Sequence, residues 1–388
     1  MPPLHNLDLR MRQHYLPHIP DQTSLAFPLL FQNDAMGAFN EWARFYEKEY
    51  APEERVARFQ AWQSNLEKVR SRGRSNSGEY SIGMNGHADL TTEEFRLRYF
   101  GENPTDMVEE MQKEEMTNNK GWQKFQKPWT FDETVPAKTV DWTKENVIGH
   151  VKDQHVNGSK CGCCYAFGGV AGIEAADALY TGKGVTPLSE QQIVDCDPYD
   201  HGCHGGGFLN VWRYTIENGG IDTEAHWPYV ANETGHCHHR REKRRTVTSI
   251  DHIVTIPERS EHALMQSLTH TPTSVAVCCG AFLDDWHLYT GGMFNESAHC
   301  THPLDHAVLA VGYGTDDQGR DYFKIKNSWG AHWGDEGFIY LRRGVEEPRG
   351  QNGLATFPAF PVKTTPSPKA RVDNDLGRKG AEKLAAAF

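Results

Sequence analysis

The chain has 388 residues, of which 40 are lysine or arginine and 52 are aspartate or glutamate, so its formal net charge is −12. Its 10 Trp, 14 Tyr and 18 Phe supply enough apolar mass for a core, which excludes a wholly disordered protein. The acidic balance argues against nucleic acid as a partner, and no apolar run approaches the ~18 residues of a membrane span. The length allows two or three domains, or one large domain with appendages.

The first third of the chain divides into three segments. Residues 1–34 are rich in Pro and His and lack the charged start and apolar stretch of a signal peptide, so we expect a leader of unknown structure. Residues 35–72 predict two helices broken at Pro52, because aromatic and aliphatic residues recur three and four apart. Residues 101–130 are polar and predict an exposed linker.

The composition changes near Val135, where Gly, Cys and Trp become frequent. A helix is expected over 164–180. Runs of β-branched and aromatic residues bounded by turns predict strands at 246–256, 272–279, 306–313, 321–327 and 337–342. Helices first and strands later indicate the α+β class. Residues 363–388 contain little that could pack and are expected to form a disordered tail.

Cys164 stands at the start of the helix expected over 164–180. A helix N-terminus stabilises an anion, so a thiol there tends to have a lowered pKa and to act as a nucleophile. For a single cysteine, burial or a disulfide is the more frequent alternative. Nucleophilic catalysis also needs a basic partner. The chain offers His306 at the entrance of one apolar strand and Asn327 at the end of the next.

Taken together, these residues resemble the papain-like cysteine peptidases of the cathepsin L type. The motifs fall in the family's order: Asp141-Trp142, Gln154, Cys161-Gly162-Cys163-Cys164-Tyr165, Cys203-His204-Gly205-Gly206, Asp305-His306 and Asn327-Ser328-Trp329-Gly330. The resemblance covers residues 35–362. It implies a papain-like α+β fold of two lobes, one helical and one like a β-barrel, with the active-site cleft between them and a helical prosegment before them.

The resemblance assigns catalytic roles. Cys164 would be the nucleophile, His306 the base that forms a thiolate–imidazolium pair with it, and Asn327 the residue that orients the imidazole. Gln154 and the Cys164 backbone N–H would form the oxyanion hole. Trp329 would shield the hydrogen bond between the imidazole and the amide from water.

Further residues would bind substrate. Gly205 and Gly206 would let a substrate backbone lie flat against the cleft wall, and Asp305 belongs to the same site by family position. The pocket for the second residue before the cut would be lined by Phe208, Ala276, Leu304 and Phe357. All four are apolar, so a hydrophobic substrate side chain is expected there. The two glycines are not followed by an insertion of the kind that would close the cleft, which implies an endopeptidase.

Three departures from the family pattern stand out. Cys163 occupies a position where Ser or Ala is usual, Tyr165 replaces a Trp, and about four extra residues separate Gln154 from Cys161. A loop can bulge outward without moving its ends, and we expect this of the extra residues near 155–158.

Upstream, residues 35–100 resemble the family's inhibitory prosegment of the I29 type. Two motifs carry the likeness: Glu54, Arg58, Trp62, Asn65 and Val69 with Gly73 in place of Asn, and Gly83, Asn85, His87 and Asp89 with His87 in place of Phe. The prosegment would inhibit the peptidase domain, residues 131–362, until cleavage in the linker within 120–135. A charged His87 in this contact would weaken docking near pH 6, so we expect acid-triggered release.

The nine cysteines are an odd number, so at least one lies outside any intramolecular disulfide. By family position, Cys161 should pair with Cys203, and Cys196 with Cys237. Cys300 matches the first member of a third family bridge, but the partner position holds Asn352. This third bridge is therefore expected to be absent, with Cys300 free or bonded to Cys278 or Cys279.

Two expected disulfides indicate an oxidising compartment. Sequons for N-glycosylation at Asn157, Asn232 and Asn295 point the same way. A lysosome, a vacuole or secretion would fit, although no signal peptide is visible.

The sequence thus predicts a cysteine endopeptidase zymogen, a monomer that needs no cofactor or metal and acts on protein and peptide substrates. One alternative is an inactive homologue that binds or inhibits through its prosegment, which the intact triad argues against. A thiol redox or metal protein is more remote. A metal site at residues 236–239 and a polyanion patch at residues 240–245 are less expected than a disulfide half-cystine and a solvated loop.

Overall fold

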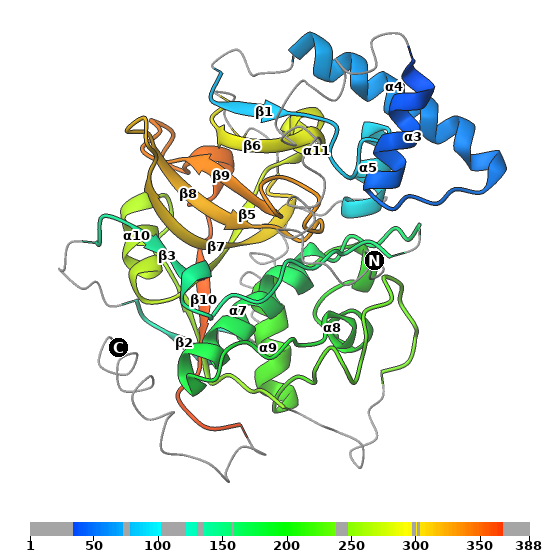
Figure 1. The fold of residues 1–388 in the computed structure, drawn as a ribbon. Coiled ribbons are helices and arrows are strands. Elements are labelled where there is room, and N and C mark those ends of the chain that lie inside the picture. The colour runs from blue at the N-terminus through cyan, green and yellow to red at the C-terminus, as the bar shows by residue number, and fades with distance from the viewer. Residues whose placement is uncertain are drawn as a thin grey trace.

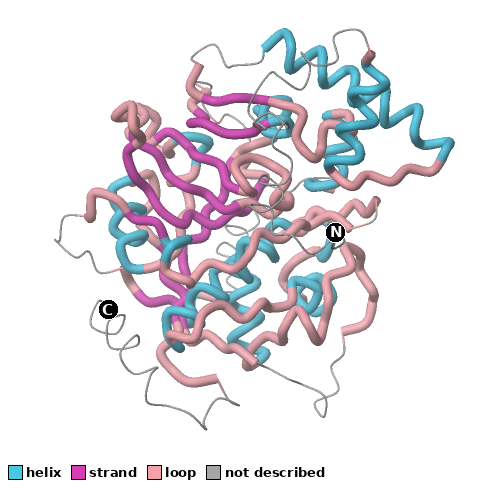
Figure 2. Tube along the Cα trace, viewed as in Figure 1, coloured by secondary structure: helices cyan, strands magenta, loops and turns pink. Residues whose placement is uncertain are grey.

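The computed structural model describes residues 34–72, 78–101, 122–129, 136–156, 158–237, 247–296, 300 and 303–367. The leader up to residue 33, most of the linker, Asn157 of the first sequon, the basic run and the tail from residue 368 lie outside these residues. The described part consists of a helical lobe, a sheet-rich lobe and a helical prosegment beside them (Figure 1). Helices and strands are largely segregated (Figure 2), as the α+β expectation requires.

The prosegment contains helices α3 (Ala35–Phe45), α4 (Pro52–Arg72) and α5 (Thr92–Phe100). Each helix begins at a residue suited to that position. Asp34 Oδ1 accepts a hydrogen bond from the Gly37 N–H at 2.8 Å. Proline occupies the first position of α4, and Thr91 forms a capping box with Glu94 at the start of α5.

Aromatic side chains hold α3 against α4. The rings of Phe39 and Trp62 meet edge to face at 5.7 Å, and Trp42 lies 6.4 Å from Trp62. This matches the stripe expected over 35–72 except at Val56, which is 62% exposed. Val56 faces solvent even though the residue before it already contacts α3, where the Arg55 guanidinium donates to Asn40 Oδ1 at 2.7 Å.

The helical lobe is built from α7 (Cys164–Thr181), α8 (Glu190–Cys196) and α9 (Phe208–Asn218). Glycine lets α7 approach its neighbours closely. A Cβ on Gly169 would lie 2.9 Å from Val211 of α9, and the Gly169 carbonyl accepts the indole N–H of Trp212 at 2.9 Å. The close approach fixes α7, and with it the residue at its first position, against the rest of the lobe.

The strands form one sheet in the order β1-β6-β9-β8-β7-β5-β10-β4-β2, and β3 pairs with β7. Pairings are antiparallel except β2 with β4 and β6 with β9. The bounds are β1 (Tyr80–Ile82), β2 (Gln126–Lys127), β3 (Val140–Asp141), β4 (His252–Thr255), β5 (Thr273–Val277), β6 (Tyr289–Phe294), β7 (His306–Thr315), β8 (Asp321–Lys326), β9 (Phe338–Arg342) and β10 (Ala359–Val362). Helices α10 (Glu261–His270) and α11 (Leu283–Leu288) complete this lobe.

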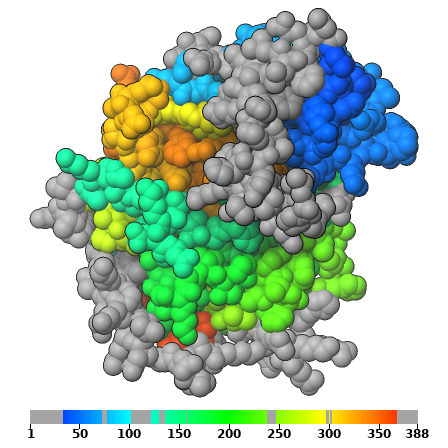
Figure 3. All heavy atoms as spheres, in the orientation of Figure 1, coloured from blue at the N-terminus to red at the C-terminus, as the bar shows by residue number. Residues whose placement is uncertain are grey.

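Strand β1 belongs to the prosegment but pairs with β6 of the sheet-rich lobe, with Tyr80 opposite Gly292 (Figure 1). The prosegment therefore docks partly by adding a strand at the sheet edge. In the space-filling view its atoms, in blue, lie along one side of the molecule above the green helical lobe (Figure 3).

The linker differs from the fully exposed segment that its polar composition predicts. Trp122 is 3% exposed and belongs to the main core cluster. Residues 126–127 form β2, and Lys124 Nζ lies 2.7 Å from Glu217 of α9. Trp122, which is buried in the core, thus anchors the described end of an otherwise polar linker.

The expectation of a disordered tail from residue 363 is wrong for its first five residues. Lys363 and Ser367 are each 3% exposed, and Lys363 Nζ donates to Ser367 Oγ at 2.8 Å. The Thr364 and Thr365 hydroxyls both donate to the Asp251 carboxylate. Polar contacts order this segment without the apolar residues that the sequence reading required.

The structure joins Cys161 to Cys203 and Cys196 to Cys237, the two pairings that the resemblance implied. It also joins Cys278 to Cys300, which selects one of the alternatives left open for Cys300. The Asn352 amide donates to the Cys278 carbonyl at 2.8 Å, so a hydrogen bond stands where the family pattern has a sulfur. Cys163, Cys164 and Cys279 are free thiols, and all three are buried.

Among the described residues, no helix combines the length and apolar character needed to cross a membrane.

Candidate active site

His306 and Asn327 meet at one end of the neighbouring strands β7 and β8. His306 Nε2 donates to Asn327 Oδ1 at 2.7 Å, and the Ser328 N–H donates to the same oxygen at 2.8 Å. His306 Nδ1 has no hydrogen-bond partner among the described residues. A neutral ring with its proton on Nε2 therefore keeps a lone pair on Nδ1 to receive a proton.

Trp329 covers this hydrogen bond. Its ring centroid lies 4.7 Å from that of His306, and the side chain is fully buried. Trp333 lies behind it at 4.9 Å. The two indoles exclude water from the imidazole–amide contact, which strengthens the contact by lowering the local dielectric constant.

Cys164 is the first residue of α7 and is 4% exposed. Helix α7 lies directly on β7, since a Cβ on Gly168 would lie 3.1 Å from Ala307. Burial raises the pKa of the Cys164 thiol to about 12, although the Ala307 backbone N–H acts in the opposite direction. The expected lowering by the helix N-terminus is thus wrong for this closed form, because burial outweighs it.

His306 shows the complementary shift. Burial lowers its pKa to about 4, and the hydrogen bond with Asn327 only partly opposes this. Because burial disfavours the charged form of both groups, the closed form favours a neutral thiol and a neutral imidazole. The ion pair needed for attack requires a more solvated site than the one present here.

Gln154 lies beside Cys161 despite the longer loop between them. Its side chain is fully buried, with Nε2 donating to the Cys161 carbonyl at 3.3 Å and Oε1 accepting from Ser328 Oγ at 2.9 Å. The described extra residues contact one another, since the Gly158 N–H donates to His155 Nε2. They leave the ends of the loop in place, as expected.

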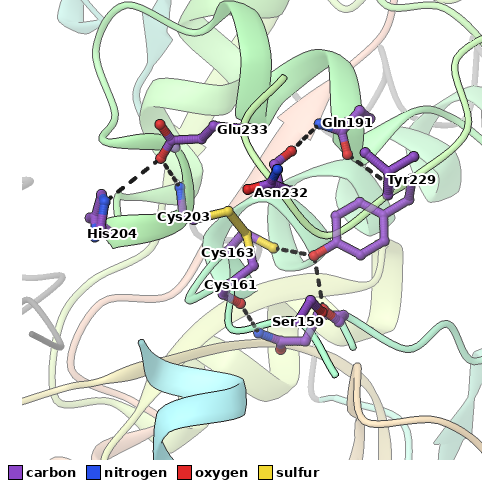
Figure 4. The surroundings of a disulfide bond; sticks show 12 residues. Ser159, Cys161, Cys163, Gln191, Cys203, His204, Tyr229, Asn232 and Glu233 are labelled. Carbon is purple, nitrogen blue, oxygen red and sulfur yellow. Dashed lines mark hydrogen bonds and ion pairs between the residues drawn. A yellow bond between two sulfur atoms is a disulfide. The ribbon is translucent and has the colours of Figure 1, made fainter. Parts of the chain in front are cut away.

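Cys163, which stands where the family usually has Ser or Ala, contacts Tyr229 (Figure 4). Tyr229 Oη donates its single proton to the Gln154 carbonyl at 2.8 Å, so the Cys163 thiol is the donor to Oη at 2.9 Å. Burial raises the pKa of Cys163 far above its usual range, which keeps the thiol protonated. The sequence reading did not single out Tyr229, which follows a turn-forming Trp-Pro pair.

Two family models match this chain. One described as papain family cysteine protease matches residues 136–362, and one described as cathepsin propeptide inhibitor domain (I29) matches residues 39–95. The chain belongs to the papain family of cysteine proteases. The α+β papain-like fold and the inhibitory propeptide that the sequence predicts are both confirmed.

Curated relatives of this cysteine protease include two from Arabidopsis thaliana. The probable cysteine protease RD21B is 38% identical over 316 residues, which are 81% of this chain and 63% of that protein. Cysteine protease XCP2 is 36% identical over 328 residues, which are 84% of this chain and 86% of that protein. The chain therefore spans less than two thirds of the first relative but most of the second.

Solved precursors share the fold of this protease. A recombinant stem bromelain precursor is 29% identical with a TM-score of 0.73, and the match covers 86% of this chain and all of that one. Digestive procathepsin L 3 from the larval midgut of Tenebrio molitor is 27% identical with a TM-score of 0.70, covering 85% of this chain and 99% of that one. Both are proforms, like the closed arrangement of this papain-family chain.

The segment Gly205–Gly207 of the protease leads into α9. The Cys161–Cys203 disulfide lies before it, and the Gly162 N–H donates to the Cys203 carbonyl at 2.8 Å. Tyr165, which replaces the usual Trp, donates a hydrogen bond from its hydroxyl to the Gly202 carbonyl at 2.8 Å. Gly205 has φ of 107°, a conformation that disfavours other residues.

The candidate lining residues of the substrate pocket come from different elements. Ala276 lies on β5 opposite Ala307, next to the pair Val277–His306. Phe208 opens α9 and is fully buried, and Leu304 is 6% exposed. Phe357 is only partly buried and lies against the same core cluster. Asp305, which directly precedes β7, accepts hydrogen bonds from the Cys279 and Gly280 N–H groups at 2.9 Å.

The prosegment of this protease covers the catalytic residues. The Phe100 ring lies 5.8 Å from His306 and 6.0 Å from Trp329, and it is 4% exposed. A Cβ on Gly162 would lie 2.5 Å from the Phe100 carbonyl. The sequence placed the prosegment boundary at residue 100 but did not identify which of its residues cover the site.

His87, the expected pH-sensitive residue, is buried in the same contact. Its Nε2 lies 2.9 Å from the Trp329 carbonyl oxygen. The backbone carbonyl of His87 accepts a hydrogen bond from His287 Nε2 at 2.9 Å. Burial, with Lys48 nearby, holds the pKa of His87 well below its usual range. The docked prosegment therefore carries a neutral imidazole.

No group of three or more His, Cys, Asp or Glu suited to a metal ion occurs within the described ranges. Part of the candidate cluster at residues 236–239 lies outside those ranges. Cys237 within it is bonded to Cys196.

Proposed function

We propose that this protease hydrolyses internal peptide bonds through Cys164, His306 and Asn327. The observation that carries the proposal is the hydrogen bond from His306 Nε2 to Asn327 Oδ1 at 2.7 Å, which leaves Nδ1 available. Once the prosegment leaves, Cys164 transfers its thiol proton to Nδ1. Asn327 holds the ring orientation while the imidazolium exists.

The thiolate attacks the substrate carbonyl, forming a carbon–sulfur bond and an oxyanion. Gln154 Nε2 and the Cys164 N–H donate hydrogen bonds to that oxyanion. His306 then protonates the amine, the carbon–nitrogen bond breaks, and a thioester acyl-enzyme remains. His306 next takes a proton from water, whose oxygen attacks the thioester, and the acid product leaves as the thiol is restored.

Specificity would come from the apolar side chains near β5 and α9. Phe208, Ala276, Leu304 and Phe357 favour a hydrophobic substrate residue at the second position before the cut. Gly205 and Gly206 would hold the substrate backbone, and Asp305 and Trp329 would belong to the same substrate site. Protein and peptide substrates are therefore the expected partners, and the enzyme would act as a monomer.

Residues 35–100 would act as an intramolecular inhibitor of a peptidase domain spanning 131–362. Maturation would cut within 120–135. Trp122 is buried and Lys127 pairs in β2, so we place the cut outside 122–127. A protease needs several exposed, extended residues to act on a chain.

An oxidising compartment, such as a lysosome or vacuole, or the exterior of the cell, fits the three disulfides. Of the described sequons, Asn232 is exposed. Asn295 Nδ2 instead donates to the Glu79 carboxylate of the prosegment. A glycan at Asn232 is therefore more compatible with the closed zymogen than one at Asn295.

The test is activation of the full chain at mildly acidic pH, followed by labelling with an epoxide-type active-site inhibitor and mapping of the modified residue. We expect peptide amide hydrolysis and label on Cys164, with both lost in Cys164→Ala and both retained in Cys163→Ala. No turnover after prosegment removal would overturn the proposal and favour an inactive homologue that acts by binding.

A further inference from the structure

The hydroxyl of Tyr229 joins Cys163, the N-cap residue of α7, to the backbone of Gln154. Its oxygen lies 2.9 Å from Cys163 Sγ and 2.8 Å from the Gln154 carbonyl oxygen (Figure 4). Burial raises the pKa of Tyr229 well above its usual range, so the hydroxyl keeps the proton that it donates to the carbonyl. The hydroxyl thus accepts from a thiol and donates to a backbone oxygen at the same time.

The rest of Tyr229 is fixed relative to α7. Its ring meets the Phe167 ring of α7 edge to face, with the two centroids 5.0 Å apart. The Tyr229 N–H donates to Glu224 Oε1 at 2.8 Å. The hydroxyl therefore holds a defined position relative to the helix that begins with Cys164.

Gln154 is anchored on its other side by Ser328, the residue after Asn327. The Gln154 N–H donates to the Ser328 carbonyl at 3.0 Å, and Ser328 Oγ donates to Gln154 Oε1 at 2.9 Å. These contacts fix the backbone N–H and the side-chain oxygen of Gln154 beside the end of β8. The backbone carbonyl of the same residue is held by Tyr229.

The Gln154 carbonyl is the first of a loop that is longer than the family pattern. About four extra residues separate Gln154 from Cys161, so the Cys161–Cys203 disulfide restrains Gln154 less closely than a short connection would. A longer loop costs more conformational entropy to hold in one arrangement. The hydrogen bond from Tyr229 supplies a restraint at the start of this loop. Two departures from the family pattern, the extra residues and Cys163, therefore meet at one side chain.

This restraint matters because the two donors of the oxyanion hole come from different elements. In the proposed mechanism the oxyanion accepts from Gln154 Nε2 and from the Cys164 N–H. One donor belongs to the loop and the other to α7, so their separation depends on what ties the loop to the helix. Such donors act at about 2.7–3.1 Å from the oxyanion, so a small displacement of either one weakens the stabilisation.

We propose that Tyr229 is a positioning residue for the oxyanion hole, which fixes Gln154 relative to α7, and that Cys163 orients its hydroxyl for this role. This rests on the proposed function, in which Gln154 donates to the oxyanion. Without the hydroxyl, the backbone of Gln154 moves relative to α7 and Nε2 no longer meets the developing charge at the required distance. The loss falls on the chemical step, because the transition state carries the oxyanion and the bound substrate does not.

A double-mutant cycle on the activated enzyme isolates this role. Tyr229→Phe should lower kcat by up to about a hundredfold, the loss that follows removal of one oxyanion donor, with KM nearly unchanged. Gln154→Ala should lower kcat at least as much. Tyr229→Phe added to Gln154→Ala should then cost less than about twofold, since the residue through which it acts is gone. Additive losses in the double variant would overturn the proposal.

Variants of Cys163 test its part, and another tyrosine serves as the matched control. Cys163→Ala should show part of the loss in kcat seen in Tyr229→Phe, and Cys163→Ser, which keeps a donor, should restore most of it. Equal losses in the two Cys163 variants would contradict the donor role. Tyr313→Phe is the control, because Tyr313 is a buried tyrosine of β7 whose hydroxyl also donates to a backbone carbonyl, that of Ala137, at 2.9 Å. A loss in Tyr313→Phe as large as in Tyr229→Phe would show a general effect on the fold and contradict the proposal.

Two reagents separate the oxyanion hole from the nucleophile. Iodoacetamide alkylates Cys164 by displacement of iodide from carbon and forms no oxyanion, so its rate should be the same in activated Tyr229→Phe and native enzyme. A peptide aldehyde adds the Cys164 thiol across its carbonyl, and the oxygen of the resulting hemithioacetal occupies the oxyanion hole. Its affinity should fall in Tyr229→Phe by the same factor as kcat. Slower alkylation with unchanged aldehyde affinity would place the effect of Tyr229 on the thiol and overturn the proposal.

A last measurement does not depend on turnover. In the full chain carrying Cys164→Ala, hydrogen exchange of the peptide that contains Gln154 should become faster when Tyr229→Phe is added and stay unchanged when Tyr313→Phe is added. If no variant cleaves any peptide, the proposed function fails, whereas the exchange result still decides whether Tyr229 restrains Gln154. Equal exchange in all three proteins would contradict that restraint.

Discussion

Gln154 Nε2 donates a hydrogen bond to the backbone carbonyl oxygen of Tyr99 at 2.9 Å. In the proposed mechanism this nitrogen belongs to the oxyanion hole, so a prosegment carbonyl occupies the donor that the transition state would use. The Cys161 N–H contacts the Arg98 carbonyl at 3.4 Å in the same stretch. The inhibitor therefore satisfies the buried polar groups of the site as well as covering them.

The closed zymogen should protect its nucleophile from alkylation. Cys164 is 4% exposed, and burial raises its pKa to about 12, so both access and thiolate fraction are low. We expect iodoacetamide to modify Cys164 at least roughly a hundredfold faster after activation than before it, measured by mass spectrometry near neutral pH. The Cys164→Ala chain serves as the control, because it shows how much label the other two buried free thiols, Cys163 and Cys279, take up. Equal rates at Cys164 before and after activation would contradict the closed geometry.

Phe100 should be a principal determinant of inhibition. Removing a buried phenylalanine ring costs about 3 kcal/mol, or roughly a hundredfold in a docking constant. Phe100→Ala should therefore hydrolyse a small fluorogenic peptide before processing, while the native zymogen stays silent. Met36→Ala is the control, because Met36 is in the prosegment but 45% exposed. If both variants remain equally silent, the ring does not contribute to the block.

Acid should release the prosegment in part through His87. Its docked pKa is well below its usual range, whereas the free imidazole titrates near 6.5, so the released form binds more protons. Docking therefore weakens as pH falls below about 6.5, by up to about tenfold per unit. Asp153 has the opposite sign, because burial raises its docked pKa to about 6. If release of the prosegment also exposes Asp153, the docking constant should fall by less than about tenfold per pH unit.

Two substitutions separate charge from shape at this position. His87→Gln can keep a donor to the Trp329 carbonyl but cannot titrate, and His87→Phe removes both properties. Autoactivation rate against pH should flatten in both variants relative to the native zymogen. A native-like slope in either variant would show that His87 is not the acid-sensitive group.

Asn327→Ala should lower kcat while leaving KM nearly unchanged. Losing an acceptor for a charged imidazolium costs about 1.5–3 kcal/mol, which corresponds to roughly 10- to 150-fold in rate. Asn327→Asp retains the acceptor oxygen for His306 Nε2 and should lose less activity. The comparison is made on activated enzyme by steady-state kinetics. A rise in KM with kcat unchanged would argue for a structural role of the amide.

The bridge Cys278–Cys300 should be found by mapping peptides from a non-reducing digest. It closes a loop with a sequence separation of 22, for which loop-closure entropy suggests about 3 kcal/mol of stability. Cys300→Ser with Cys278→Ser should therefore unfold at lower denaturant concentration than the native chain. Recovery of Cys300 with Cys279 instead would contradict the pairing.

Local sequence patterns anticipated much of the scaffold. The helix 164–180 and the strands near 272–279, 306–313, 321–327 and 337–342 are present as α7, β5, β7, β8 and β9. Between 246 and 256 only 252–255 pair as β4, because a strand ends where its partner β10 ends. Strands β6 and β10 and helices α8 and α11 were missed, since short, mostly buried segments carry weak periodicity. Helices α9 and α10 were also missed, although each has an apolar face at helical spacing.

The sequence by itself determined which residues stand at the motif positions, because Cys164, His306 and Asn327 are marked by their neighbours in the chain. Tertiary structure alone decided that Tyr99 meets Gln154 and that Cys300 meets Cys278. It also decided that the Cys164 pKa is raised rather than lowered. The physical reason is that hydrogen-bond partners and desolvation depend on which distant segments pack together, whereas motifs and helix starts depend only on adjacent residues.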